Sequence, residues 1–234
     1  MLKLNDLASL GQSIWYDYIR RQFITRGELQ NLIDKGLRGV TSNPSIFEKA
    51  IAGSSDYDDD IKSLINEELS TEQIYEKLAV KDIQLAADLL LPVYEKTNKT
   101  DGYISIEVSP KLAHNTEGTI SEAKKLYAEI GKPNVMIKVP ATQQGIPAIT
   151  ELISLGISVN VTLIFSIENY KQVAEAYLVG LEKLVEKGGD LKSVASVASF
   201  FISRIDAAVD KELDLLGNNE LKGKIAIANA KKAF

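Results

Sequence analysis

The sequence predicts an α/β fold of the (β/α)8 TIM-barrel type, with six of the eight strands present and extra helices between the second and third strands. Three observations carry this prediction. Short runs rich in β-branched and aromatic residues alternate with longer segments of helical periodicity. Strands separated by helices are typical of parallel sheets with right-handed crossovers. The 234 residues contain no Pro-, Gly- or Ser-rich linker, so we expect one domain over residues 1–234.

Each predicted strand is a short β-rich run bounded by turn residues or helical segments. The six runs are 13–18, 38–42, 103–108, 134–139, 157–163 and 193–198. The stretch 44–97 is helical for too long to be one crossover helix, so we expect two or three helices inserted there. The C-terminal stretch 222–234 is locally ambiguous between a strand and a helix.

Two helices have clear signals at their ends. Residues 119–130 are predicted to form a helix that begins with a Thr119-x-x-Glu122 capping box and ends at Gly131. Residues 169–187 have apolar side chains at helical spacing, and the pair of glycines that follows ends the helix. Both helices are expected to cover one face of the sheet.

The predicted strands have two different faces. In 103–108, Ile104 and Ile106 alternate with Ser105 and Glu107. A doubly wound sheet would bury such polar residues under helices. In a barrel the apolar face contacts the outer helices, and polar residues near the strand ends point inward, where barrel enzymes place their chemistry. The barrel is therefore favoured over the doubly wound sheet. The polar residues concerned are Asp17, Asn43, Glu107, Lys138, Asn160 and Thr162.

Each of these polar residues has an ordinary alternative explanation when it is taken alone. Lys138 could be a solvated lysine on an edge strand, where it would discourage aggregation. Asp17 could cap the next helix, and Asn43 followed by Pro44 is a common turn signal. Glu107 could be a surface charge. Their joint occurrence at successive strand ends favours a shared site.

The composition excludes several classes of site. The chain has no Cys and a single His, His114, so disulfides, thiolate metal sites and His clusters are excluded. Glycine-rich nucleotide-binding loops are absent, so we expect neither a metal nor another cofactor. A net charge of −5 argues against nucleic-acid binding. The sequence contains neither a membrane-spanning stretch nor a secretory signal, and on that basis we expect the cytoplasm.

A lysine in a dry interior has one chemistry that suits the remaining residues. Its neutral amine attacks a ketone and forms a Schiff base, and the iminium then accepts electrons from a breaking carbon–carbon bond. A nearby carboxylate moves the protons. Paired carboxylates alone could instead indicate a glycosidase.

Five collinear motifs resemble the transaldolase family, and similarity to this family runs from near residue 10 to the end of the chain. A further stretch, QSIWYDYIRR at 12–21, is similar to the first strand of that family. The five motifs are GVTSNPSIF at 39–47, SIEVSP at 105–110, VMIKVPAT at 135–142, SVNVTLIFS at 158–166 and SVASFFISRID at 196–206. The chain looks most like the longer-chain branch, which inserts helices between the second and third strands.

The resemblance implies a role for each matched residue. Lys138 matches the Schiff-base lysine, Glu107 the carboxylate that works through a catalytic water, and Thr162 the residue that orients this water. Asp17 matches the acid/base for the substrate hydroxyl beside the bond that breaks. The remaining matches bind substrate: two asparagines hold the dihydroxyacetone unit, a serine contacts a substrate hydroxyl, an aromatic lines the site and an arginine binds phosphate. These are Asn43, Asn160, Ser199, Phe201 and Arg204.

The resemblance implies transfer of a dihydroxyacetone unit between sugar phosphates in the pentose phosphate pathway. A related Schiff-base aldolase that releases dihydroxyacetone is the alternative within this chemistry. Because only six strands are found, the chain is also expected to be incomplete at its C-terminal end, so a non-catalytic, associating fragment is a further alternative. The stretch 222–229 could instead act as a makeshift strand. For Arg204 the alternative is a surface ion pair with Asp206 or Asp210.

Overall fold

The computed structural model describes residues 4–234, and its strands form one six-stranded sheet. The strands are β1 (Trp15–Asp17), β2 (Gly39–Thr41), β3 (Tyr103–Glu107), β4 (Val135–Pro140), β5 (Val159–Ile164) and β6 (Ser196–Phe200). Their order in the sheet is β1-β2-β3-β4-β5-β6, and the pairs β1/β2, β2/β3 and β5/β6 are parallel. A doubly wound sheet reverses its strand order at a switch point, whereas a β/α barrel adds each strand beside the previous one. The sheet is therefore of the barrel type, and all six predicted strands are confirmed.

The chain divides into two compact units. Unit 1 comprises the chain up to Pro110 together with Glu122–Ile137, and unit 2 comprises Lys111–Ser121 together with Lys138–Phe234. Strand β4 contributes residues to both units, as does the helix α7 (Thr116–Ile130). The single domain expected over residues 1–234 stays a prediction.

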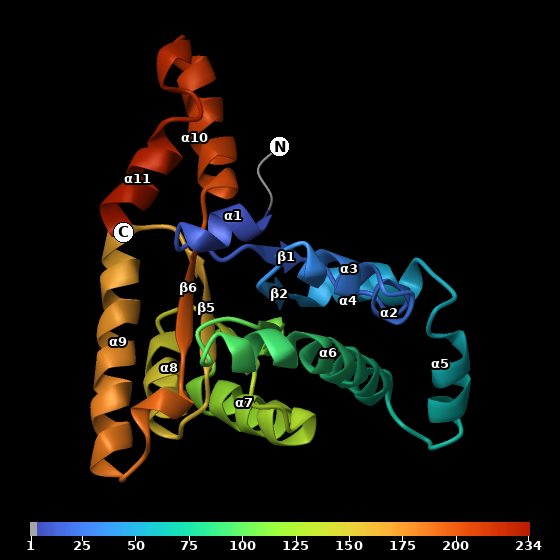
Figure 1. The fold of residues 1–234 in the computed structure, drawn as a ribbon. Coiled ribbons are helices and arrows are strands. Elements are labelled where there is room, and N and C mark those ends of the chain that lie inside the picture. Colours follow the sequence, from blue (N-terminus) through green and yellow to red (C-terminus); the bar gives the residue numbers. More distant parts are fainter. Residues whose placement is uncertain (1–3) are drawn as a thin grey trace. The chain divides into compact units, whose positions relative to one another are not determined.

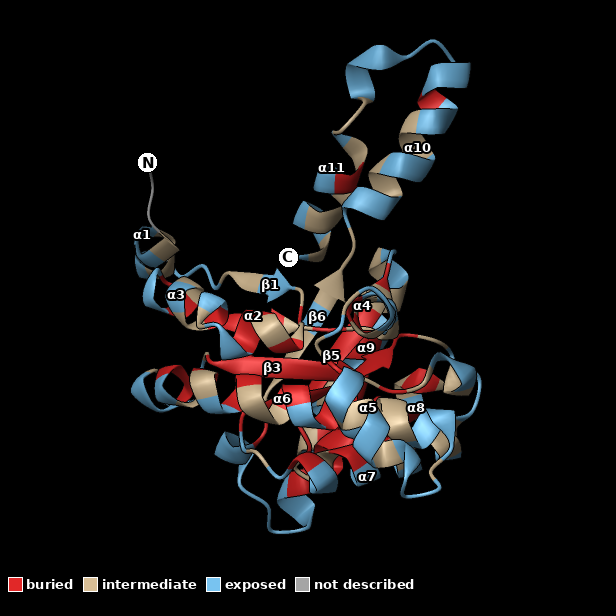
Figure 2. Cartoon of the chain, turned by 90° about the vertical axis from the view of Figure 1, so that its right-hand side faces the viewer, coloured by how far each residue is buried: buried red, intermediate tan, exposed pale blue. Residues whose placement is uncertain are grey.

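Unit 1 contains strands β1 to β3, one helix that precedes β1 and the helices that lie between these strands. These helices are α1 (Leu4–Ser9), α2 (Arg21–Thr25), α3 (Glu28–Asp34), α4 (Pro44–Ala52), α5 (Asp58–Ile65) and α6 (Thr71–Lys96). The last three are the helices predicted between the second and third strands. Helix α6 contacts β3, and its capping box joins Ser70 and Gln73. Its side chains Ile83 and Leu90 are fully buried, as is Ile104 of β3, so the core of unit 1 lies between this helix and this strand. Figure 2 shows β3 buried along its length.

Unit 2 contains β5, β6 and the helices that follow β4. These are α8 (Gly145–Ser154), α9 (Ile167–Glu186), α10 (Ser203–Leu215) and α11 (Ile225–Ala233), with short 3-10 turns at Leu191–Ser193 and Asn219–Leu221. Helices α8 and α9 lie side by side (Figure 1), and a Cβ at Gly180 would lie 2.7 Å from the Cβ of Ile153, so glycine permits this close approach. Helix α11 lies beside α10. The ambiguous stretch 222–234 is thus largely helical, as its alanine content favours, and the alternative of a makeshift strand over 222–229 is wrong.

The capping box predicted for the helix over residues 119–130 is wrong. Helix α7 begins at Thr116, three residues earlier, and the side chain of Asn115 accepts a hydrogen bond from the amide of Gly118 at 2.9 Å. Thr119 lies inside the helix, where its hydroxyl donates to the carbonyl of Leu112. Glu122 accepts a hydrogen bond from the amide of Ser109 instead. The end of the helix at Ile130 is confirmed, because Gly131 takes a φ of +61° there.

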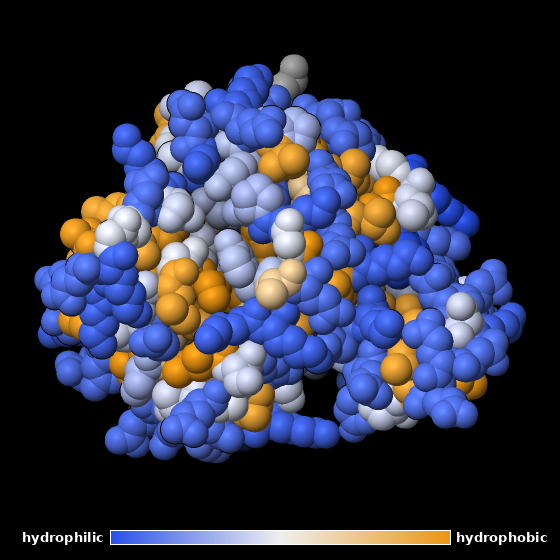
Figure 3. Space-filling model, turned by 90° about the horizontal axis from the view of Figure 1, so that it is seen from below, coloured by the Kyte–Doolittle hydropathy of each residue, from blue (hydrophilic) through white to orange (hydrophobic). Residues whose placement is uncertain are grey.

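The surface seen from below is mostly hydrophilic, with apolar side chains in separate patches (Figure 3). Among the large apolar side chains that are exposed are Leu178 and Val185 of α9 and Leu215 and Leu216 at the end of α10. Over residues 4–234, no helix has the length and apolar content that crossing a bilayer requires.

Two arginines in the segment after β1 form ion pairs with the inserted helices of unit 1 and with the loop between them. Arg20 forms a bidentate pair with Asp56, with N–O distances of 2.7 and 2.8 Å. This hydrogen-bonded guanidinium lowers the pKa of the Asp56 carboxyl. The side chain of Arg21 is 10% exposed and pairs with Asp60 and with the fully buried Asp82. The hydroxyl of Tyr57 donates to Asp82 at 2.8 Å, so the Asp82 carboxylate has partners at both oxygens.

The substitution Arg21→Met should be strongly destabilising, because it leaves the Asp82 carboxylate buried without its cation. We expect the free energy of unfolding to fall by about 3–5 kcal/mol, as for other broken buried pairs. Urea denaturation followed by circular dichroism measures the change. Lys62→Met is the matched control, since its pair with Asp59 is exposed and should contribute nothing measurable. Equal unfolding free energies for Arg21→Met and the wild type would contradict this account.

Candidate active site

In unit 1, three polar side chains form a row across strands β1 to β3. Asp17 is in register with Thr41, and Thr41 with Ser105. Side chains in register across parallel strands share a face. The Ser105 hydroxyl donates to the Thr41 hydroxyl at 2.8 Å, which confirms that these two meet. Asp17 therefore lies at the end of a hydroxyl-lined row near the C-terminal ends of the strands.

Asp17 is exposed, and its neighbours in sequence point elsewhere. Tyr16, Tyr18 and Phe23 form an aromatic cluster with ring centroids 5.3–5.7 Å apart. The residue at the N-cap of the next helix is Arg20, which makes no side-chain capping bond. The alternative in which Asp17 caps that helix is therefore wrong.

Asn43 has a structural role that the sequence did not separate from its predicted one. It is the N-cap of α4, and its Oδ1 accepts a hydrogen bond from the amide of Ile46 at 3.0 Å. With Oδ1 engaged, a ligand would meet the Nδ2 donors of this side chain. A donor of this kind suits hydroxyl and carbonyl oxygens.

Glu107 is partly buried at the end of β3, in surroundings that the inserted helices supply. Burial, together with the charges of Glu107, Glu122 and Glu48, raises the pKa of the Tyr75 phenol to about 12. Tyr75 of α6 therefore stays protonated near these carboxylates at neutral pH. Burial also raises the pKa of Glu122, whose carboxylate holds the amide of Ser109, two residues after Glu107.

In unit 2, Lys138 lies in β4 with only 7% of its surface exposed. Because β4 has a neighbour on each side in the sheet order, the alternative of a solvated edge lysine is wrong. Burial of a lysine is rare unless the charge has partners or a function. This position is the expected one for a lysine nucleophile.

Two of the predicted binding residues are joined directly in unit 2. Asn160 of β5 is 1% exposed, and its Oδ1 accepts a hydrogen bond from the Ser199 hydroxyl of β6 at 2.9 Å. Thr162, also 1% exposed, follows Asn160 on the same strand, and its carbonyl accepts from the amide of Ala141 at 2.8 Å. The two strands thus present amide and hydroxyl groups on one face.

Phe201 and Arg204 also meet in unit 2. The guanidinium carbon of Arg204 lies 4.8 Å from the centroid of the Phe201 ring, which is cation–π geometry. Over the described part of the chain Arg204 pairs with neither Asp206 nor Asp210, and Asp210 accepts instead from the amide of Gly223 at 3.1 Å. The alternative of a surface ion pair is therefore wrong. Of the nine candidate residues, unit 1 holds Asp17, Asn43 and Glu107, and unit 2 holds Lys138, Asn160, Thr162, Ser199, Phe201 and Arg204.

Several residues that contact the candidate residues or lie near them were not predicted from the sequence. Alternation places Ser105 on the polar face of residues 103–108, but the prediction did not include Ser105 or its register partner Thr41 among the site residues. Tyr75 had no signal, because its place near Glu107 depends on how α6 returns to the sheet. Trp15 is the chain's single tryptophan and shares the face of Asp17. A Cβ at Gly39, its partner on β2, would lie 2.4 Å from the Trp15 ring, so the ring lies directly on the glycine.

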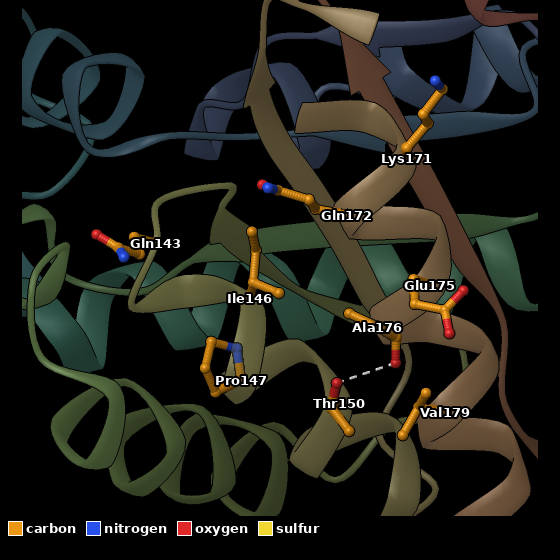
Figure 4. A pocket seen from close by; sticks show the side chains of 9 residues that line it. All are labelled: Gln143, Ile146, Pro147, Thr150, Lys171, Gln172, Glu175, Ala176 and Val179. Atoms are coloured by element: carbon orange, nitrogen blue, oxygen red, sulfur yellow. Dashed lines mark hydrogen bonds between the residues drawn. The ribbon is translucent and has the colours of Figure 1, made fainter. Parts of the chain in front are cut away.

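A pocket of about 690 Å³ lies elsewhere, between the outer faces of α8 and α9 (Figure 4). Its walls include Ile146, Pro147 and Val179, and the Thr150 hydroxyl donates there to the carbonyl of Ala176 at 3.1 Å. None of the nine candidate residues lines it. This groove between helices is therefore separate from the candidate active site.

The fold and the polar strand ends define a class of protein. A singly wound parallel sheet with a buried lysine on an interior strand, and with carboxylate, amide and hydroxyl groups at strand ends, is the arrangement of a β/α-barrel enzyme. A family model described as transaldolase/fructose-6-phosphate aldolase matches residues 14–234. The chain belongs to this transaldolase/fructose-6-phosphate aldolase family.

Curated relatives agree with the family assignment. The chain is 51% identical to a transaldolase of Trichodesmium erythraeum, over 99% of this chain and 64% of the relative. It is 49% identical to transaldolase 2 of a Nostoc species, with the same coverage, and 50% identical to transaldolase 2 of Streptomyces avermitilis, over 99% and 63%. The chain thus spans a little under two thirds of the length of these relatives.

The substitution Gly39→Ala tests the contact beneath Asp17. The added methyl group overlaps the Trp15 ring, so we expect the ring to shift and the chain to lose about 1–3 kcal/mol of stability. Thermal melting and the emission of this single tryptophan report both effects. The double variant Trp15→Phe/Gly39→Ala should recover part of the stability, because the smaller ring leaves room for the methyl group. Additive losses in the double variant would contradict the proposed overlap.

Proposed function

We propose that the chain transfers a dihydroxyacetone unit from a ketose phosphate to an aldose phosphate through a Schiff base. The donor is sedoheptulose 7-phosphate or fructose 6-phosphate, and the acceptor is glyceraldehyde 3-phosphate or erythrose 4-phosphate. This reaction belongs to the pentose phosphate pathway, and we assign it to the cytoplasm. The observation that carries the proposal is the buried Lys138 on an interior strand, in a chain of the transaldolase family.

The proposed reaction begins at the Lys138 amine. The amine attacks the C2 carbonyl of the ketose, and loss of water from the carbinolamine gives an iminium. Glu107 moves the protons of this step through a water that Thr162 orients. Asp17 then takes the proton of the C4 hydroxyl, the C3–C4 bond breaks, and its electron pair enters the iminium to form an enamine. The aldose phosphate leaves.

The second half runs in reverse with a different aldehyde. The enamine carbon attacks the acceptor carbonyl, Asp17 returns its proton to the new alkoxide, and water hydrolyses the iminium to release the product ketose. Asn43 and Asn160 hold the hydroxyl groups of the dihydroxyacetone unit, and Ser199 contacts a further hydroxyl. Phe201 lines the site. Arg204 binds the phosphate as a charge-assisted donor.

A second candidate is the aldolase reaction, in which the enamine is protonated to the iminium and water then hydrolyses the iminium, which releases dihydroxyacetone and the free lysine amine. The matching family model covers fructose-6-phosphate aldolase as well as transaldolase, which keeps this alternative open. Product analysis separates the two. A transferase needs erythrose 4-phosphate to turn over fructose 6-phosphate, whereas the aldolase releases dihydroxyacetone without it.

Lys138 is expected to form the covalent adduct. Borohydride reduction in the presence of fructose 6-phosphate should add the mass of a dihydroxyacetone unit to the peptide that carries Lys138, as mass spectrometry of the digest shows. Lys171→Ala, on the outer helix α9, is the matched control and should be labelled like the wild type. Labelling at another lysine, or persistent labelling of a folded Lys138→Met variant, would exclude the assignment. A folded wild-type chain that gives no adduct would favour a non-catalytic partial barrel.

The two carboxylates should fail at different steps. Glu107→Gln should slow formation and hydrolysis of the imine, since both steps move protons through water. Asp17→Asn should still form the reducible adduct but should slow carbon–carbon cleavage by roughly 10²- to 10⁴-fold, the usual contribution of a general base. Rapid quench with borohydride measures the first step, and release of the aldose phosphate measures the second. Loss of trapping in Asp17→Asn together with normal turnover in Glu107→Gln would reverse the assigned roles.

A further inference from the structure

Leu163, next to Thr162 in strand β5, has an unusual backbone conformation. Its φ is +62°, and the other non-glycine residues with positive φ within residues 4–234 are Glu68, Asn98 and Lys99, which lie in turns after helices. A branched apolar residue in the left-handed region inside a strand is strained, and strain of this kind persists only where its surroundings impose it. The neighbouring residues of the sheet must therefore impose this conformation.

The cause is an extra residue in β5. Val161 is paired with Ala198 of β6, and Ile164 with Phe200, so Thr162 and Leu163 together stand opposite Ser199 alone. This is the two-against-one arrangement of a β-bulge. Because side chains alternate along a strand, one extra residue exchanges the two faces beyond the bulge.

The consequence concerns Phe165. By plain alternation Phe165 would share the face of Val161, away from Asn160 and Thr162. Beyond the bulge it lies with Phe201, which follows Ser199 by two residues and comes directly after the end of β6. The two rings are stacked, with centroids 5.3 Å apart and planes inclined by 17°. Phe201 in turn carries the Arg204 guanidinium at 4.8 Å, so the bulge builds a platform of two rings and one cation.

Main-chain hydrogen bonds hold the bulge on both sides. The carbonyl of Thr162 accepts from the amide of Ala141, and the carbonyl of Ile164 accepts from the amide of Phe201 at 2.9 Å. The carbonyl of Phe165 accepts from the side chain of Asn229 in α11 at 3.0 Å. Phe165 itself remains 41% exposed, so it closes no core and its ring is available at the surface of the site.

We propose that Phe165 and Leu163 are positioning residues for substrate phosphate: the bulge at Leu163 delivers the Phe165 ring to Phe201, and the stacked rings hold the Arg204 guanidinium for the anion. The inference rests on the proposed function, in which Arg204 binds the phosphate. Phe165 acts through Phe201 and Arg204 and touches no reacting atom. Without the stack, Phe201 turns and Arg204 samples orientations that do not meet the phosphate.

The first test removes the ring and keeps its hydrophobic character. Phe165→Leu should weaken binding of inorganic phosphate and of fructose 6-phosphate about three- to tenfold, the size expected for one aromatic contact. It should also move the Nε–Hε NMR resonance of Arg204, identified with Arg204→Lys, because ring currents act on groups near an aromatic face. Phe165→Tyr should restore both. Phe200→Leu is the matched control, since its ring contacts Tyr170 at the neighbouring position and should leave both readouts unchanged.

The second test separates the backbone from the side chain at Leu163. Leu163→Gly keeps the positive φ, which glycine adopts readily, so phosphate affinity should stay within twofold of the wild type. Leu163→Val preserves more of the side chain but cannot take this φ, so it should shift the Arg204 resonance and weaken phosphate binding as Phe165→Leu does. A merely structural role for the side chain predicts the opposite order, with glycine worse than valine.

The outcomes distinguish this inference from the proposed function. If Arg204→Lys and Arg204→Ala bind phosphate as the wild type does, Arg204 does not bind the phosphate. The shift of the Arg204 resonance in Phe165→Leu then shows by itself whether Phe165 positions Arg204. If Arg204 variants lose binding but Phe165→Leu changes neither the affinity nor the resonance, the positioning role is overturned. Loss of binding in Leu163→Gly with retention in Leu163→Val overturns the role of the bulge.

Discussion

The burial of Lys138 within an interior strand is the constraint on which the arrangement of the polar groups depends. Moving an ammonium group out of water is costly unless polar partners surround it. The strands therefore need a polar face, and alternation leaves only the other face for the apolar side chains that contact helices. Asn160, Thr162 and Ser199 lie on the polar face in unit 2. Fully buried Val159 and Val161 occupy the other face of β5.

The inserted helices of unit 1 supply both apolar and polar side chains around β3. Helix α6 contributes apolar side chains to the core beside β3, but it also brings Tyr75 close to Glu107. Arg21 then joins the segment after β1 to α5 and α6 through Asp60 and Asp82. The segment that follows Asp17 is thus held by charged groups of α5 and α6, and α6 is also the helix that carries Tyr75. Paired arginines fix such a segment more firmly than apolar contacts alone, because each carboxylate accepts in a defined geometry.

The strands and the six polar strand-end residues could be predicted from the sequence because both follow from alternation. Five of the six strands begin one to three residues later than predicted, which is the usual uncertainty of strand ends. The capping box at Thr119 failed for a physical reason: Asn115 offers an equivalent cap one turn earlier, and sequence spacing alone could not choose between them. Tyr75 and the Arg21 network could not be predicted, since both depend on contacts between residues distant in sequence.

Strand β5 shows most clearly where alternation stops being informative. The run VNVTLIF alternates between apolar and polar residues as far as Thr162 and then continues with three apolar residues. If the alternation of faces simply continued, Phe165 would lie on the face of Val161. A bulge has no required residue type, and Leu163 is among the residues least expected at positive φ. The position of the bulge is set by the neighbouring segments. One residue of β6 stands opposite two residues of β5, and the carbonyls of Thr162 and Ile164 accept hydrogen bonds from Ala141 and Phe201. The strain at Leu163 is thus imposed by the sheet, and its effect is to stack the Phe165 ring on Phe201, the ring that lies under the Arg204 guanidinium.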